Sequence, residues 1–157
     1  IGTKVLIFML ELVLLASSCR CVMQVDFEPH GECHINIVDD IIVIEAKGPW
    51  NIEFIRELHR RLANVASQFE ENNTYLLIRL IGQALAGEKE IDEHIKFIGR
   101  RRATAVALDL SECQTAQISK EIFTRIYMVT EQKHQCFTDK SDAIAWLKLI
   151  KSGKSQP

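Results

Sequence analysis

The reactive side chains of this sequence are a few cysteines and histidines, and their spacing decides which chemistry they could share. Cys113 could act as a nucleophile if His94 or His134 lay beside it, because a thiolate needs a nearby base near neutral pH. The sequence shows no recognisable nucleophile elbow or oxyanion loop around these residues. We therefore expect no catalytic residues and no enzymatic activity.

A transition metal would find donor atoms in His30, Cys33 and His34. Ligands packed so closely on a turn and a strand rarely close a tetrahedral site. The cysteines follow no zinc-finger or Cys-x-x-Cys spacing: Cys19, Cys21, Cys33, Cys113 and Cys136. We expect reduced structural thiols, no metal site and no other cofactor.

Composition indicates one ordinary globular domain. The chain has 157 residues, of which 47% are hydrophobic and 25% charged, and this is enough to bury a core without disulfides or metals. The formal net charge of -2 gives no reason to expect a nucleic-acid partner, which would require a concentrated basic surface. The basic cluster Arg100–Arg102 follows the acidic segment Glu88–Glu93, which is typical of a helix with a cationic carboxyl end.

Residues 1–22 differ from the rest of the chain. Lys4 precedes the apolar run Val5–Ala16, which is too short to span a bilayer but suits the apolar region of a secretory signal. Small residues before Cys19 would also suit a lipoprotein signal. The alternative is a non-native leader, with the true start at Met23. Under either hypothesis the folded domain covers residues 23–151, and residues 152–157 form a disordered tail.

Two short apolar runs, Cys33–Val38 and Ile41–Ala46, predict strands. The polar pair Asp39-Asp40 between them indicates a tight hairpin, so these strands should be antiparallel neighbours. Gly48-Pro49 then predicts a sharp turn into a helix. Apolar residues at intervals of three and four define the buried stripe of that helix: Ile52, Ile55, Leu58, Leu62, Val65 and Phe69.

The rest of the chain alternates between apolar strands and amphipathic helices. In order, the predicted elements are a strand at Thr74–Ile81, a helix around Ile91–Ile98, a strand at Ala103–Leu110, a helix at Ile118–Tyr127, a strand at His134–Phe137 and a helix at Ala143–Ile150. Gly82–Gly87 is predicted as a turn and Gly99 as a helix end. Asp139 or Ser141 is predicted to cap the last helix. This order predicts an α/β fold with a mixed, mostly parallel five-stranded sheet covered by about four helices.

Several segments together resemble one known family. They read IIVIEAKGPWN from Ile41, ATAVALDLSE from Ala103, FTRIY from Phe123 and CFTDKSDAIAWLK from Cys136. This sequence resembles the SpoIIAA-like branch of the STAS superfamily over roughly residues 27–149. The resemblance implies a small bacterial cytoplasmic protein with a STAS fold, which is also similar to lipid-binding domains of the Sec14 type. If the leader is a real signal, the alternative is a membrane-anchored lipoprotein tethered through Cys19.

Anti-sigma-factor antagonists of this superfamily are switched by phosphorylation of a serine after the third strand. Here that junction reads Leu80-Ile81-Gly82-Gln83-Ala84-Leu85, with neither serine nor threonine. The Asp-x-Ser arrangement at Asp109–Ser111 follows the next strand, so we do not assign the switch to it. The resemblance therefore implies a regulatory or ligand-binding module that lacks the phosphoacceptor.

Trp50 stands at a strand-to-helix junction, where open α/β sheets commonly bind ligands. Alternatively it closes the core, with its indole NH bonded to a neighbouring carbonyl. Asn51 is a predicted N-cap for the following helix. We take Trp50, Asn51, Glu53 and Ser111 as candidate residues for binding a ligand or partner. An unknown protein partner or a small apolar ligand is expected, and the sequence leaves a homodimer open.

Overall fold

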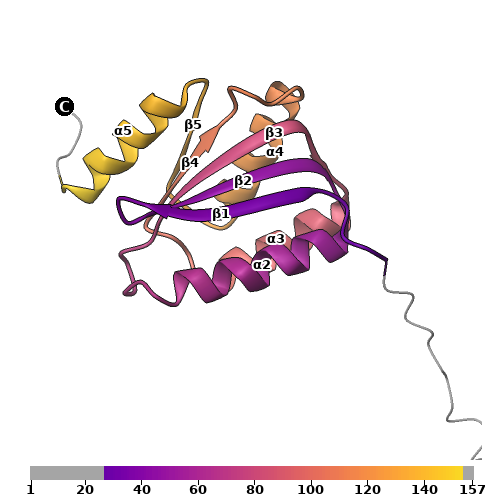
Figure 1. Ribbon diagram of the computed structural model, residues 1–157, viewed down its shortest axis with the longest axis horizontal. Coiled ribbons are helices and arrows are strands. Elements are labelled where there is room, and N and C mark those ends of the chain that lie inside the picture. Colours follow the sequence, from indigo (N-terminus) through magenta and orange to yellow (C-terminus); the bar gives the residue numbers. More distant parts are fainter. Residues whose placement is uncertain (1–26, 154–157) are drawn as a thin grey trace, which may run out of the picture.

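The computed structural model describes residues 27–153 (Figure 1). Within that range the chain forms one five-stranded sheet and four helices. In chain order the elements are β1 (Glu32–Val38), β2 (Ile41–Trp50), α2 (Ile52–Ala66), β3 (Tyr75–Ala86), α3 (Glu88–Arg100), β4 (Ala105–Asp109), α4 (Ala116–Val129), β5 (His134–Phe137) and α5 (Lys140–Lys151). The predicted α/β class with a mixed sheet is confirmed.

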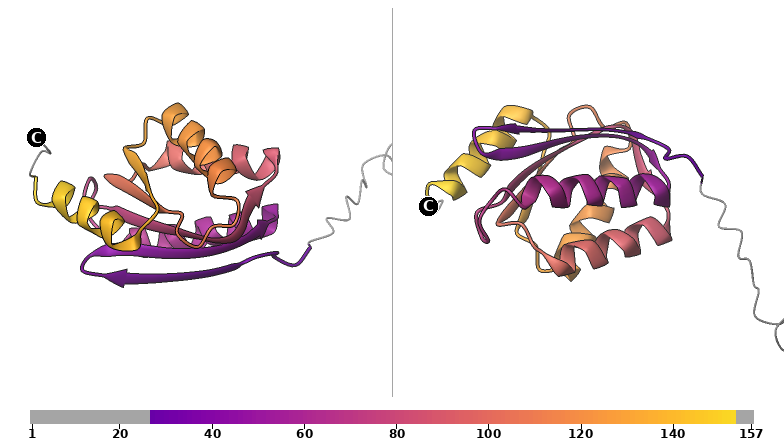
Figure 2. Two further views of the ribbon diagram at one scale, coloured as in Figure 1. Left: turned by 90° about the horizontal axis from the view of Figure 1, so that it is seen from above. Right: turned by 60° about the horizontal axis from the view of Figure 1, so that its bottom comes forward.

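The sheet has the strand order β1-β2-β3-β4-β5, with β1 antiparallel to β2 and the other pairs parallel. Each parallel strand therefore lies beside its predecessor in the sequence. Because such crossovers are right-handed, the connecting helices α2, α3 and α4 must all lie on one face of the sheet. They do so, and α5 follows the last strand and packs on the opposite face (Figures 1 and 2).

Both faces of the central strands are buried, which explains their continuous apolar runs. Ile78 and Leu108 belong to the core under α2, α3 and α4. Their neighbours Leu77 and Ala107 point to the other face and pack with Leu147 of α5. Alternation along each strand thus divides the apolar residues between two cores.

The predicted hairpin between β1 and β2 is confirmed as a two-residue loop. Asp39 and Asp40 have φ angles of 52° and 59°, as a type I′ turn requires. Lys148 of α5 donates to Asp39 Oδ2 at 2.7 Å, and Lys151 donates to Asp40 Oδ2 at 3.0 Å. The hairpin is therefore joined to the carboxyl end of the last helix.

Two predicted helix caps are confirmed. Asn51 Oδ1 accepts a hydrogen bond from the amide of Phe54 at 3.0 Å, at the start of α2. Asp139 Oδ1 accepts from the amides of Ser141 and Asp142 at 2.7 and 3.2 Å, at the start of α5. Asp139, and not Ser141, is therefore the cap of the last helix.

The sharp turn predicted at Gly48-Pro49 is wrong. Strand β2 continues through this cis peptide to Trp50, and the break takes the form of a register shift against β3. Pro49 has no amide hydrogen for the ladder, which accounts for the irregularity at this point. Gly48 passes very close to β3. A Cβ atom added to it would lie only 2.3 Å from the backbone oxygen of Gln83.

The turn predicted at Gly82–Gly87 is also wrong, since β3 continues to Ala86. The loop after β4 supplies the missing hydrogen-bond partners. The Gly82 amide donates to the Glu112 carbonyl at 3.1 Å, and the Gln114 amide donates to the Gly82 carbonyl at 2.8 Å. Gly82 has a φ of 65°, a left-handed conformation that suits glycine.

Two helix ends differ from the prediction. Helix α2 ends at Ala66, before Phe69, and α3 continues through Gly99 to Arg100. Arg101 explains the first difference, because its guanidinium donates to the carbonyls of Ala66 and Phe69, both at 3.2 Å. This side chain thereby satisfies carbonyl groups that the end of α2 leaves unpaired.

The close approach of β2 to β3 can be tested with glycine variants. Gly48→Ala should lower the free energy of unfolding by about 1–3 kcal/mol, because the added methyl group meets the β3 backbone. Gly99→Ala is the matched control: it adds a methyl group in the last turn of α3, where no atom lies within 4 Å. It should stabilise the protein by about 0.5–1 kcal/mol. Urea unfolding measures both changes, and equal effects would contradict the close approach.

Candidate functional site

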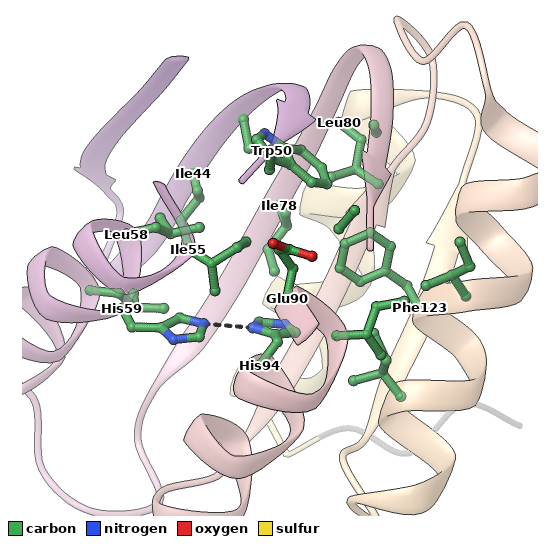
Figure 3. A pocket seen from close by; sticks show the side chains of 17 residues that line it. Ile44, Trp50, Ile55, Leu58, His59, Ile78, Leu80, Glu90, His94 and Phe123 are labelled. Atoms are coloured by element: carbon green, nitrogen blue, oxygen red, sulfur yellow. Dashed lines mark hydrogen bonds between the residues drawn. The ribbon is translucent and has the colours of Figure 1, made fainter. Parts of the chain in front are cut away.

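A cavity of about 60 Å³ lies between the sheet and helices α2, α3 and α4 (Figure 3). We call it the apolar cavity. Its lining residues come from five elements: Ile44, Ala46 and Trp50 of β2; Ile55, Leu58, His59 and Leu62 of α2; Ile78, Leu80, Ala84 and Ala86 of β3; Glu90, Ile91 and His94 of α3; and Ile122, Phe123 and Ile126 of α4. Glu90 and two histidines are the titratable side chains in this hydrocarbon and aromatic wall.

A second cavity of about 290 Å³ adjoins the first and shares Leu62, Ile78 and His94 with it. We call it the arginine cavity, because Arg100–Arg102 line it together with apolar residues. Tyr127 of α4 belongs to the same wall. His94 thus lies where a hydrocarbon cavity meets a cavity with a basic edge.

The three arginines of this edge have different surroundings. Arg101 is bonded to the backbone carbonyls at the end of α2, and Arg102 pairs with Glu131 at 3.2 Å on the surface. Arg100 is exposed and has neither an ion pair nor a hydrogen bond within residues 27–153. Its charge is therefore available to whatever occupies the arginine cavity.

Helices α2 and α3 meet through two histidines (Figure 3). His59 Nε2 lies 2.8 Å from His94 Nδ1, and the His59 ring also stacks on Phe97 with centroids 4.0 Å apart. Burial lowers the pKa of His94 to about 4. Burial, His94 and the positive charge of Arg100 lower the pKa of His59 to about 3. Both rings are therefore neutral near neutral pH.

A hydrogen bond between two neutral imidazoles requires one ring to donate and the other to accept. His94 Nε2 is buried and has no partner among the described residues. When His59 donates to His94, His94 Nε2 carries the remaining proton and is an unused donor. A buried polar atom without a partner is costly in free energy, so this atom favours a ligand that can bond to it.

Of the predicted binding residues, Trp50 lines the apolar cavity. It is 8% exposed, stacks on Phe54 with ring centroids 6.1 Å apart, and meets Phe123 edge-on at 6.4 Å. Its Nε1 is buried without a partner in the described part of the chain, so the expected bond to a carbonyl is not formed. The pyrrole edge of the indole faces Gly31, where an added Cβ would lie 2.7 Å from Trp50 Cδ1.

The structure does not gather the four predicted binding residues into one site. Asn51 caps α2, and Glu53 lies half-buried in the first turn of that helix. Ser111 is exposed in the loop after β4, and its amide donates to Asp109 Oδ1 at 2.9 Å. Of the four, Trp50 alone lines either of the two cavities.

Cys113 is surrounded by hydroxyl groups. Its Sγ lies 3.7 Å from Thr115 Oγ1 and 3.5 Å from Ser119 Oγ. The two histidines that were candidates for its general base have other hydrogen-bond partners. His94 bonds to His59 on α2, and His134 Nδ1 bonds to a backbone carbonyl at 2.9 Å. Within residues 27–153 no group of three His, Cys, Asp or Glu side chains could hold a metal ion.

Arg79 of β3 joins three neighbouring strands by ion pairs. Its register partners are Glu45 on β2 and Asp109 on β4. Arg79 Nε donates to Asp109 Oδ2 at 3.0 Å, and the guanidinium also bonds to Glu45 and Glu112. We call these four residues the Arg79 cluster. Asp109 is 1% exposed, so this cluster places a fully buried charge at the centre of the sheet.

The ionised state of Asp109 depends on its partners. Burial alone would raise the pKa of this carboxyl, but hydrogen bonds from Ser111 and Arg79 outweigh that effect and hold its pKa below the usual range. Asp109 is therefore a carboxylate at neutral pH, neutralised by the Arg79 guanidinium.

His59 and the Arg79 cluster were not among the residues predicted from the sequence. His59 lies four residues after Ile55 and three before Leu62, so the helical period does place it on the buried face. Arg79 and its two strand partners each interrupt an apolar strand with a charge, and opposite charges in neighbouring buried strands are a signal for pairing. Glu90 gave no such signal, because it lies among other acidic residues.

Comparison with known proteins shows the fold. A solved structure from Shewanella loihica PV-4, an uncharacterised protein of the DUF3478 family with a SpoIIAA-like fold, matches with a TM-score of 0.55 and 18% identity. The match covers 78% of this chain and 97% of that one. No family model and no curated protein matches the sequence. The chain therefore has a SpoIIAA-like fold, as its sequence predicted.

Between residues 27 and 153, no helix combines the length and the hydrophobicity needed to cross a bilayer. The predicted leader at residues 1–22, with the lipoprotein candidate Cys19, lies outside the described residues, as does part of the predicted tail. The domain limits 23–151 stay a prediction.

The histidine pair predicts a loss of stability in mild acid. The folded protein binds fewer protons than the unfolded chain below pH 6.5, because both histidines have lowered pKa values. Lowering the pH from 7 to 5 should therefore reduce the free energy of unfolding by up to about 2 kcal/mol for each histidine. Urea unfolding of the double variant His59→Phe/His94→Phe should show a much smaller pH dependence, and an unchanged one would contradict the assignment.

The Arg79 cluster predicts a large effect from a single substitution. Arg79→Met should lower the free energy of unfolding by about 3–5 kcal/mol, because it leaves the Asp109 charge buried and unpaired. The control Lys47→Met breaks an exposed ion pair with Glu32 and should cost at most about 1 kcal/mol. Adding Asp109→Asn to Arg79→Met should restore part of the stability, since it removes the buried charge. No recovery would show that the charge is not the cause.

Proposed function

We propose that this protein is a non-enzymatic ligand-binding module that holds a small apolar ligand between its sheet and helices α2, α3 and α4. The apolar cavity carries the proposal, because five elements contribute a continuous hydrocarbon and aromatic lining to it. Ligand sites in proteins are typically concave and mostly apolar, with a few polar groups that fix orientation. Here those groups are Glu90 and the histidine pair.

The position of the cavity in the fold supports the same function. Trp50 and Ala86, the last residues of β2 and β3, both line it. Open α/β sheets commonly bind ligands beyond the carboxyl ends of their parallel strands. The cavity extends from that end along the face covered by three helices.

A non-enzymatic role agrees with the surroundings of the reactive groups. The Cys113 thiol contacts hydroxyl groups, and the two histidines in the cavity wall bond to each other. Because α2 and α3 both line the cavity and meet at these histidines, an occupant could alter their contact. Such a change is the means by which a bound ligand would regulate a protein partner.

Binding can be tested with decan-1-ol, a neutral apolar probe, followed through methyl resonances. Titration should shift the methyl signals of Ile91 and Ile122, which line the cavity, and leave those of Leu147 unchanged. Leu147 is a buried residue of α5 on the opposite face, so it reports general changes in the protein. Shifts of equal size on both faces, or no shifts, would contradict the proposed site.

A pair of variants locates the binding. Ala86→Phe places a ring in the cavity wall and should weaken decan-1-ol binding at least about tenfold, since the probe and the ring compete for the same space. Ala145→Phe adds the same ring to an exposed position of α5 and should leave binding unchanged. Unaltered binding by Ala86→Phe would place the ligand elsewhere.

A further inference from the structure

The two cavities share three lining residues and differ in the charge of their walls. The apolar cavity is lined by hydrocarbon and aromatic side chains, with the Glu90 carboxylate as its acidic group. The arginine cavity is larger, and Arg100–Arg102 line it. A molecule that occupies both would meet hydrocarbon at one end and positive charge at the other.

His94 marks the boundary between these environments. It lines both cavities, and its Nε2 is a buried polar atom without a partner in the described residues. The bond to His59 allows two tautomers: when His59 donates, His94 Nε2 carries a proton and is a donor, and when His94 donates, Nε2 is an acceptor. An anion beside Nε2 selects the first tautomer. The boundary therefore offers one buried hydrogen-bond donor.

We propose that the ligand is a single-chain amphipathic carboxylate. The end of its hydrocarbon chain occupies the apolar cavity, which at about 60 Å³ is too small for a whole decyl chain, and the rest of the chain passes His94 into the arginine cavity of about 290 Å³. There the carboxylate accepts a hydrogen bond from His94 Nε2 and faces Arg100. This inference rests on the proposed function and names the chemical class of its ligand.

The surrounding charges set the orientation. Glu90 would repel an anion placed in the apolar cavity. Arg100 has no ion pair within residues 27–153, and its positive charge contributes to the lowered pKa of His59. Arg102 is neutralised by Glu131, and Arg101 keeps its charge while bonding to carbonyls. The net positive charge of this edge attracts an anionic head.

The number of donors favours a carboxylate over a phosphate. A dianionic phosphate needs several donors for its oxygens, and in the described residues the wall of the arginine cavity offers one unpaired buried donor, His94 Nε2. A carboxylate carries one charge, which Arg100 can balance. A hydrogen bond to a charged group contributes about 1.5–3 kcal/mol, which corresponds to about tenfold in affinity or more.

The test compares decanoate with decan-1-ol, which have the same chain length, by calorimetry at pH 8. At this pH the carboxylate is ionised and both histidines are neutral. Decanoate should bind about tenfold more tightly than decan-1-ol. His94→Phe keeps a ring at this position without its nitrogens, so it should abolish the preference for decanoate over decan-1-ol.

Two exposed residues on α3 form a matched pair of charge variants. Arg100→Gln removes a positive charge from the cavity edge and should weaken decanoate binding about fivefold, which is more than it weakens the binding of the uncharged decan-1-ol. Lys96→Gln removes the same charge from a position that lines neither cavity and should change decanoate binding less than about twofold. This pair remains informative if His94→Phe does not fold.

Each outcome has a definite meaning. If the unmodified protein binds decan-1-ol as tightly as decanoate or more tightly, the ligand does not need a carboxylate head group, and the proposal of an apolar site is unaffected. Equal effects of Arg100→Gln and Lys96→Gln overturn the placement of the head at the arginine cavity. If neither probe binds, the result contradicts both the proposed function and the carboxylate head group.

Discussion

Strand order constrains the rest of this molecule. Each parallel strand pairs with the next strand along the chain, so three right-handed crossovers place α2, α3 and α4 on the same face of the sheet. These helices cover that face together, and both cavities lie beneath them. Helix α5 follows the last strand and connects no two strands, so it can cover the opposite face. The location of the candidate site therefore follows from topology, whereas its chemistry depends on which polar residues the helices bring inward.

Buried polar groups on the two faces have different partners. On one face, the Arg79 cluster pairs its buried charges completely, which suits a structural role across three strands. On the other face, His59 and His94 bond to each other, and His94 Nε2 beside the cavities has no partner among residues 27–153. This incomplete pairing distinguishes a site that can receive a ligand from a cluster that is already satisfied.

Local patterns predicted the fold well where the partners of a segment are close in sequence. The Asp39-Asp40 turn and the caps at Asn51 and Asp139 are of this kind. Errors occurred where the partner is distant: β3 continues past Gly82 because the loop after β4 pairs with it, and α2 ends early beside Arg101. The binding role of the four candidate residues stays a prediction. Trp50 lies in the cavity wall, but the meeting of His59 with His94 depends on how α2 packs against α3, which helical periodicity within each segment does not specify.

We propose that the space between the sheet and helices α2, α3 and α4 receives the hydrocarbon part of a ligand. A crystal structure of the protein grown with decanoate tests this claim most directly. The account predicts electron density for a hydrocarbon chain beside Trp50 and Phe123, ending in a carboxylate within hydrogen-bond distance of His94 Nε2. An empty cavity in such crystals, or decanoate bound to another part of the molecule, would contradict it.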